Sequence, residues 1–133
     1  MPRYVVDASA AVEYLLKTPT GETVAHLIAR ATLVAPELLD VEVVSALRGA
    51  VLGGWLEDSR ARMALDDLAD WPLERIPHRT LARGAWRHLH NVTAYDAFYV
   101  AAARAENASI LTTDGRLSRA SGLGVTVQHV RMA

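Results

Sequence analysis

The chain contains 133 residues, of which 51% are hydrophobic and 22% are charged, so it carries enough apolar mass for the core of one ordinary domain. It has no cysteine, which excludes disulfides, thiolate zinc sites and a cysteine nucleophile. No apolar run reaches the roughly 18 residues that a membrane span needs, and the N-terminus lacks the pattern of a signal peptide. We therefore expect a single domain over residues 1–133 that acts in the cytoplasm, without a membrane partner.

The first half of the chain predicts two strands and four helices. Residues 3–6 are a short run of β-formers followed by Asp7, which predicts a buried strand that delivers this acid to a strand-to-helix turn. Apolar residues then recur at helical spacing from Ala8 to Leu16 and, after a Thr-Pro-Thr-Gly break, from Val24 to Ala31. The remaining elements predicted in this half are a strand at 32–35, a helix at about 37–52 and a helix at about 57–70.

The second half continues the alternation. Its clearest elements are a helix that begins after Thr93 and a strand at 109–113 that ends at Asp114. The other predictions are a strand at 73–76, a short helix at about 79–88, a helical turn around 117 and a last strand at 125–130. Strands that alternate with helices predict an α/β fold, a three-layer α/β/α domain with a mostly parallel central sheet of about five strands.

Four acids are predicted to share one edge of this sheet. Asp7 and Asp114 end strands, Glu42 lies in the second turn of the helix that follows a strand, and Asp96 lies in the first turn of a helix that leads into the next strand. Local structure offers an alternative for three of them. Asp7 could cap the following helix, Asp96 could belong to a capping box, and Asp114 could be a turn residue.

Glu42 has two competitors on its own helix. It lies about 60° from the inward line of that helix, at the rim of the buried face. Glu37 fits an ordinary acid of the first turn, and Asp40 points elsewhere. We therefore assign Glu42, and neither competitor, to the acidic edge.

Four carboxylates that meet without basic partners repel one another unless cations neutralise them. Oxygen ligands in this number select Mg²⁺ or Mn²⁺, ions that activate water for the hydrolysis of phosphodiesters. No catalytic serine or histidine is then required. The five histidines show no shared helix face, and we interpret them as surface or core residues.

Four segments of the chain together resemble the PIN-domain ribonucleases, in particular the VapC-like toxins of the VapBC toxin-antitoxin systems. They are Val-Val-Asp7-Ala-Ser9-Ala, Pro36 through Glu42 to Leu47, Thr93-Ala-Tyr-Asp96-Ala-Phe-Tyr-Val-Ala-Ala-Ala and Leu111-Thr-Thr-Asp114-Gly-Arg-Leu. The resemblance implies a Mg²⁺-dependent endoribonuclease, with Mn²⁺ able to substitute, that is a homodimer inhibited by a cognate VapB-like antitoxin. The residues it implicates are the catalytic and metal-binding acids Asp7, Glu42, Asp96 and Asp114, with the supporting hydroxyls of Ser9 and Thr112.

The chain departs from the family pattern at two places. Ser45 stands where many relatives have asparagine, and Arg116 and Leu117 stand where some PIN domains carry a further acid. We therefore expect one tightly held ion, with a second recruited alongside the RNA phosphate. Arg116 is the best candidate for contacting a phosphate at the site itself.

Three more arginines are candidates for RNA binding. Arg79, Arg83 and Arg87 are spaced i, i+4, i+8 on one face of the helix predicted at about 79–88, and the alternative is an ordinary solvated face.

Other classes of protein fit less well. A haloacid-dehalogenase-like phosphatase needs an acid where Ser9 stands, and a receiver domain needs a lysine late in the fold, whereas the only lysine is Lys17. A non-catalytic PIN-like scaffold remains as an alternative that the sequence alone leaves open.

Overall fold

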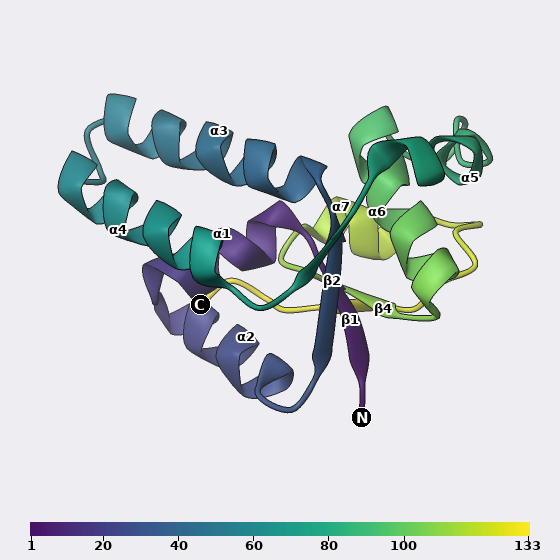
Figure 1. Ribbon diagram of the computed structural model, residues 1–133, viewed down its shortest axis with the longest axis horizontal. Helices are drawn as coiled ribbons and strands as arrows, with labels where there is room; N and C mark the ends of the chain where they lie inside the picture. The colour runs from purple at the N-terminus through teal and green to yellow at the C-terminus, as the bar shows by residue number, and fades with distance from the viewer.

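A five-stranded, all-parallel sheet runs through the computed structural model, which describes residues Met1–Ala133 (Figure 1). The strands are β1 (Arg3–Val6), β2 (Thr32–Pro36), β3 (Glu74–Ile76), β4 (Ser109–Thr112) and β5 (Val127–His129), in the spatial order β3-β2-β1-β4-β5. The central strand β1 pairs with both β2 and β4, with Val5 opposite Val34 on one side and Ile110 on the other. The predicted parallel sheet of about five strands is confirmed.

Helices cover both faces of the sheet, as expected for the three-layer architecture. In Figure 1, α1 to α4 lie to the left of the strands and α5 and α6 to the right. The helices are α1 (Ala8–Leu16), α2 (Pro19–Ile28), α3 (Leu38–Leu52), α4 (Asp58–Asp70), α5 (Ala82–Trp86), α6 (Ala94–Glu106) and α7 (Gly115–Arg119), with a 3₁₀ turn η1 (His78–Thr80). None of the helices is long and apolar enough to cross a membrane.

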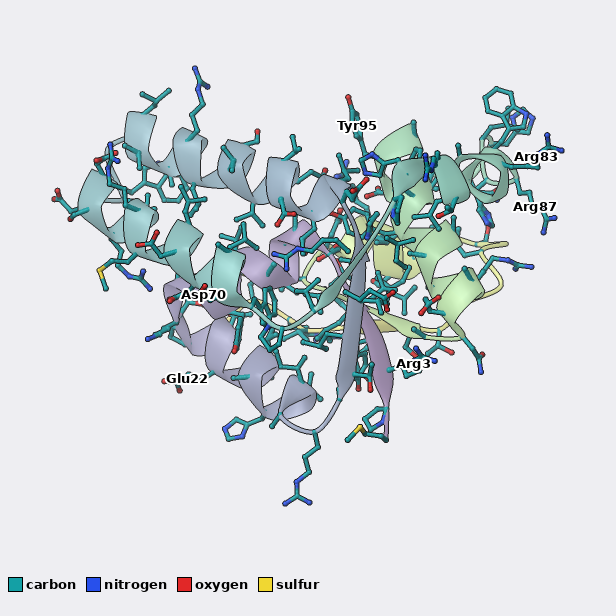
Figure 2. All side chains as sticks on the ribbon, in the orientation of Figure 1. Arg3, Glu22, Asp70, Arg83, Arg87 and Tyr95 are labelled. Atoms are coloured by element: carbon teal, nitrogen blue, oxygen red, sulfur yellow. The ribbon has the colours of Figure 1, made fainter.

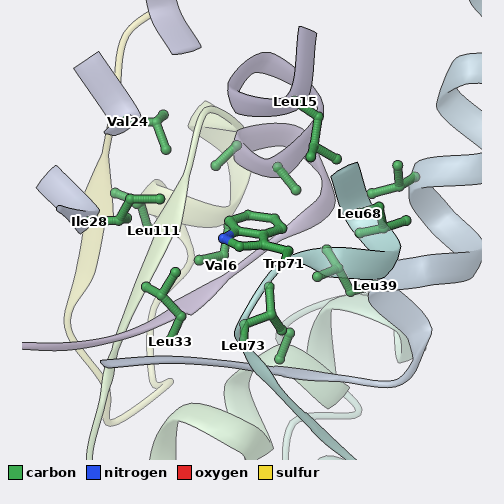
Figure 3. Packing of buried hydrophobic residues seen from close by; sticks show 14 of the residues in the cluster. Val6, Leu15, Val24, Ile28, Leu33, Leu39, Leu68, Trp71, Leu73 and Leu111 are labelled. Carbon is green, nitrogen blue, oxygen red and sulfur yellow. The ribbon is translucent and has the colours of Figure 1, made fainter. Parts of the chain in front are cut away.

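Two apolar cores lie on the two faces of the sheet. Because successive strand residues point to opposite faces, Val6 joins the core beneath α1 to α4, and Val5 joins the core beneath α5 and α6. In Figure 3, the indole of Trp71 lies at the centre of the first core, between Val6 and Leu39. The second core depends on α6, which presents small alanines to the sheet and so packs close to it.

The predicted helix at 79–88 is wrong as a single element. The chain instead makes the 3₁₀ turn η1 and then the short helix α5. The break falls at Leu81, which is buried and whose amide bonds back to the carbonyl of His78, the tighter spacing of a 3₁₀ turn. Arg79, Arg83 and Arg87 therefore do not share one helix face.

The parallel sheet gathers the ends of its strands at one edge. The β1–α1, β2–α3 and β4–α7 connections all leave this carboxyl edge, and α6 begins there because it leads back into β4. These are the positions of the four acids.

Candidate active site

Asp7 lies at the carboxyl end of β1 and is almost completely buried, with 6% of its surface exposed. One carboxylate oxygen accepts hydrogen bonds from the Ala10 amide, at 3.0 Å, and from Ser9 Oγ, at 2.7 Å. The other accepts a short hydrogen bond from Thr112 Oγ1. Burial raises the pKa of Asp7 to about 6, although these three donors pull it down. Asp7 therefore does cap α1, and it also carries a costly buried charge.

Ser9 and Thr112 join the β1–α1 turn to the β4–α7 turn. Their hydroxyl oxygens lie 3.2 Å apart, and each also accepts a backbone amide, Thr113 N–H to Ser9 Oγ and Asp114 N–H to Thr112 Oγ1, both at 2.9 Å. The structure thus places both residues against Asp7, where they fix the orientation of its carboxylate.

Asp96 interacts electrostatically with each of the other three acids. Burial raises its pKa first and the charge of Asp114 second, while Thr93 and Arg116 act in the opposite direction. The negative charge of Asp96 also helps to raise the pKa of Asp7 and of Glu42. The residue that caps α6 is Thr93, whose hydroxyl accepts the amide of Asp96 at 3.2 Å. The reciprocal hydrogen bond of a capping box, from the Thr93 amide to the Asp96 carboxylate, is not formed, so this carboxylate does not complete the cap.

Glu42 is half-buried on α3 and is held by a tyrosine that sequence reasoning missed. Tyr99 Oη donates to Glu42 Oε1 at 2.6 Å. Burial raises the pKa of Glu42, the hydrogen bond from Tyr99 lowers it, and Asp96 raises it again. Tyr99 comes from the buried face of α6, one turn after Asp96. A polar side chain on that apolar face was the available signal.

The competitors of Glu42 have other partners. Asp40 forms an ion pair with Arg75, with 3.0 Å between Oδ1 and the guanidinium, and exposed Glu37 accepts the amide of His78 at 3.4 Å. Neither faces the acidic edge as a free carboxylate.

Asp114 is the acid with a basic partner. Its carboxylate accepts the amide of Arg116 at 2.9 Å and forms an ion pair with the guanidinium at 3.3 Å. Burial acts to raise the pKa of Asp114, but the hydrogen bonds and the charge of Arg116 outweigh it and hold the pKa below its usual range. Arg116 itself is exposed, beside the site.

The remaining candidates lie elsewhere. In Figure 2, the side chains of Arg83 and Arg87 extend outward from α5 and the turn after it, at the right margin of the molecule. His88 is buried and neither ring nitrogen has a hydrogen-bond partner, which agrees with its interpretation as a core residue.

The donor set suits a hard divalent cation. Asp7, Glu42 and Asp96 have raised pKa values partly because each lies near another negative charge, and a cation among them would relieve both that repulsion and the burial of the charges. No three of these carboxylates are yet arranged so that they could hold one metal ion. The Asp7 carboxylate is hydrogen-bonded to the hydroxyls of Ser9 and Thr112, and the Asp114 carboxylate is paired with Arg116. Small rotations of these side chains would be part of binding.

Residues 4–123 match the PIN domain family. This chain belongs to the PIN-domain family. Among its curated relatives in this family, Ribonuclease VapC1 of Mycobacterium tuberculosis is 42% identical over 133 residues, covering 98% of this chain and 100% of that protein. Ribonuclease VapC12 of the same species is 34% identical, covering 95% and 98%. The resemblance to VapC-like PIN-domain ribonucleases is confirmed.

Solved structures support the fold at lower identity. The Rickettsia felis VapBC2 structure, bound to a promoter DNA fragment, matches with a TM-score of 0.60 at 17% identity, covering 96% of this chain and 98% of that one. Mycobacterium tuberculosis VapC20, described as a toxin that cleaves the sarcin-ricin loop, matches with a TM-score of 0.62 at 20% identity, covering 86% and 92%. At this identity the match concerns the PIN fold alone.

Proposed function

We propose that this PIN domain is a Mg²⁺-dependent endoribonuclease that hydrolyses RNA phosphodiester bonds as the toxin of a toxin-antitoxin pair. One observation carries the metal-dependent mechanism: Asp96 couples electrostatically to Asp7, Glu42 and Asp114 at one sheet edge, and three of the four carboxylates have a raised pKa. The names of the ribonuclease relatives support RNA as the substrate.

The four acids and their neighbours divide the work in this proposal. Asp7 and Asp96 would hold the ion, with Asp114 and Glu42 completing the cluster. A bound Mg²⁺ would supply the positive charge that activates water and stabilises the leaving oxygen. Ser9 and Thr112 fix the Asp7 carboxylate, and Tyr99 fixes that of Glu42. Because its pKa is raised, Glu42 is a better proton acceptor than an ordinary glutamate, and it would take the proton of the attacking water.

The test is RNA cleavage by the purified protein. Cleavage should require Mg²⁺ or Mn²⁺ and stop in EDTA. Asp96→Asn should reduce the rate by roughly a thousandfold, since it removes a ligand of the ion that stabilises the transition state. The matched control is Asp66→Asn, which removes an exposed carboxylate on α4. Full activity of metal-free protein in chelator would overturn the metal mechanism.

We further propose inhibition by a VapB-like antitoxin and a homodimeric state. The structures of VapBC2 and of Mycobacterium tuberculosis VapBC-5 support the first, because both are toxin-antitoxin systems. A groove of about 320 Å³ between α3 and α4, lined by Val44, Leu47 and Val51 among others, offers an apolar surface for such a partner.

Expression alone should arrest bacterial growth, and co-expression of the antitoxin should relieve the arrest. Arrest by Asp7→Asn would show that RNA cleavage is not its cause, and sedimentation of the purified protein tests the dimer.

A further inference from the structure

A basic cleft adjoins the acidic site at the same edge of the sheet. It has a volume of about 500 Å³ and lies between α7 and the segment that follows β5. Its lining includes Arg119, His129, Arg131, Ser118 and Thr113, and it contains no carboxylate. The cleft is therefore opposite in charge to the cluster beside it.

The backbone at Thr113 is a wall shared by the cleft and the acidic site. The amide of Thr113 donates to Ser9 Oγ at 2.9 Å, inside the acidic site. Its carbonyl oxygen lies 3.3 Å from His129 Nε2, inside the cleft. The next residue is Asp114. The two sites are thus one residue apart in the turn that follows β4, and one extended ligand can span both.

The Arg119 side chain can lie in the cleft because residue 115 is a glycine. A Cβ atom on Gly115 would lie 2.7 Å from the guanidinium of Arg119 and 3.7 Å from the ring of His129. Because Gly115 has no side chain, the guanidinium can fold back over the first turn of α7 beside the histidine. The ion pairs within the chain include neither Arg119 nor Arg131, so both guanidinium groups are available to an external anion.

We propose that this cleft binds a backbone phosphate of the RNA next to the phosphate that is cleaved. The inference rests on the proposed function, which places the scissile phosphate at the carboxylates. Those carboxylates repel the neighbouring phosphates of the same strand, so the strand needs cations where it leaves the site. Arginine forks match the geometry of phosphate oxygens, and a positively charged groove is the usual path of a single strand.

A double variant and a charge-matched control test the proposal. Arg119→Gln with Arg131→Gln removes two positive charges from the cleft. Lys17→Gln with Arg30→Gln removes two exposed charges, one at the C-terminal end of α1 and one two residues after α2, and neither residue lines the cleft. Both pairs are made in an Asp7→Asn background to prevent cleavage, and the probe is a short single-stranded RNA that the wild type cleaves.

We expect the cleft variant to bind this RNA about tenfold more weakly than the control. The slope of log affinity against log salt concentration should fall by about 0.7 for each phosphate contact that is lost. A series of RNAs, each with one neutral methylphosphonate linkage at a different place in the strand, shows which phosphate contacts the cleft. A neutral linkage adjacent to the cleaved bond should weaken binding to the control and have little further effect on the cleft variant.

The outcomes separate this inference from the proposed function. If the wild type cleaves RNA with Mg²⁺ while the cleft variant matches the control in affinity and salt slope, the cleft is not a phosphate site and the nuclease proposal stands. An equal penalty from the neutral linkage in both proteins would also overturn the inference. If the wild type neither binds nor cleaves RNA, both proposals fail.

Discussion

Asp7 and Asp114 occupy equivalent places in the fold, yet their pKa values move in opposite directions. Each ends one of two neighbouring parallel strands and each caps the helix that follows. Asp7 is buried and its donors are the neutral hydroxyls of Ser9 and Thr112 and an amide, which do not cancel the cost of burying a charge. Asp114 is more exposed and has the guanidinium of Arg116, which favours the charged form.

The difference shows how one acidic cluster divides into two parts. At neutral pH the inner part, around Asp7, carries charge that the metal-free fold tolerates poorly, whereas the outer part, at Asp114, is ionised and already paired. A cation is therefore expected to gain most of its binding energy at the inner part and to compete with an arginine at the outer part.

The largest expected effect is on stability, when the buried charge of Asp7 that distinguishes it from Asp114 is removed. Because the folded pKa of about 6 lies above the ordinary value of 3.8, the folded state binds more protons between these values, and stability falls as pH rises through that window. Two units correspond to roughly 3 kcal/mol. Asp7→Asn removes the charge and keeps a capping side chain. In EDTA the variant should exceed the wild type in unfolding free energy by up to that amount above pH 6, and the difference should shrink toward pH 4.

Urea unfolding of both proteins across pH 4.5 to 8 measures this difference. Mg²⁺ should stabilise the wild type at neutral pH and leave Asp7→Asn nearly unchanged, so the gap between them should close. Asp66→Asn, on the exposed face of α4, is the control and should show no such dependence on pH. A difference between Asp7→Asn and the wild type that stays constant from pH 4.5 to 8 would contradict the assignment of the strained charge to Asp7.

A smaller effect is expected at Glu42, which like Asp7 is held by a neutral hydroxyl. Tyr99→Phe removes the donor at 2.6 Å and leaves the ring to fill the core, so the pKa of Glu42 should rise further. We expect an RNA cleavage rate about tenfold lower, since one hydrogen bond to a charged group is lost. Carboxyl NMR titration of Glu42 separates this positioning role from a purely structural one.

Tyr95→Phe is the matched control on the same helix. The hydroxyl of Tyr95 makes no hydrogen bond, and its side chain extends from the top of α6 in Figure 2, with 63% of its surface exposed. This variant should leave the pKa of Glu42 and the cleavage rate unchanged. An unaltered pKa of Glu42 in Tyr99→Phe would show that the tyrosine does not tune the acid.

The sequence predicted the features that depend on local pattern. Runs of β-formers followed by helical periodicity predicted the parallel sheet, and strand ends predicted that Asp7 and Asp114 share an edge. The break in the predicted helix at Leu81 was missed because arginines recur every four residues on both sides of it. The burial of Leu81 decides the local geometry instead.

The partners of the acids depend on tertiary structure, so the sequence predicted fewer of them. Tyr99 and Glu42 are 57 residues apart and meet only because α6 and α3 both begin at the carboxyl edge. Ser9 and Thr112 were implied by family resemblance, and the structure adds their contacts with Asp7. The ion pair of Arg116 with Asp114 spans only two residues, but no pattern indicated that it would outweigh the effect of burial.

The smallest expected effect makes Asp114 resemble Asp7. In Arg116→Ala the carboxylate loses its cation, so the pKa of Asp114 should rise toward or above its ordinary value, because burial is then opposed only by backbone donors. Mg²⁺ no longer competes with a guanidinium for Asp114 and should bind the RNA-free protein roughly two- to fivefold more tightly, the scale of an exposed ion pair. Arg116→Lys keeps a charge but loses the bidentate fork, and its affinity for Mg²⁺ should fall between those of the wild type and the alanine variant.

Calorimetric titration with Mg²⁺ at low salt measures all three proteins. Weaker Mg²⁺ binding by the alanine variant would mean that Arg116 helps to arrange the cation site instead of competing for it, and the division of the cluster into an inner and an outer part would then be wrong.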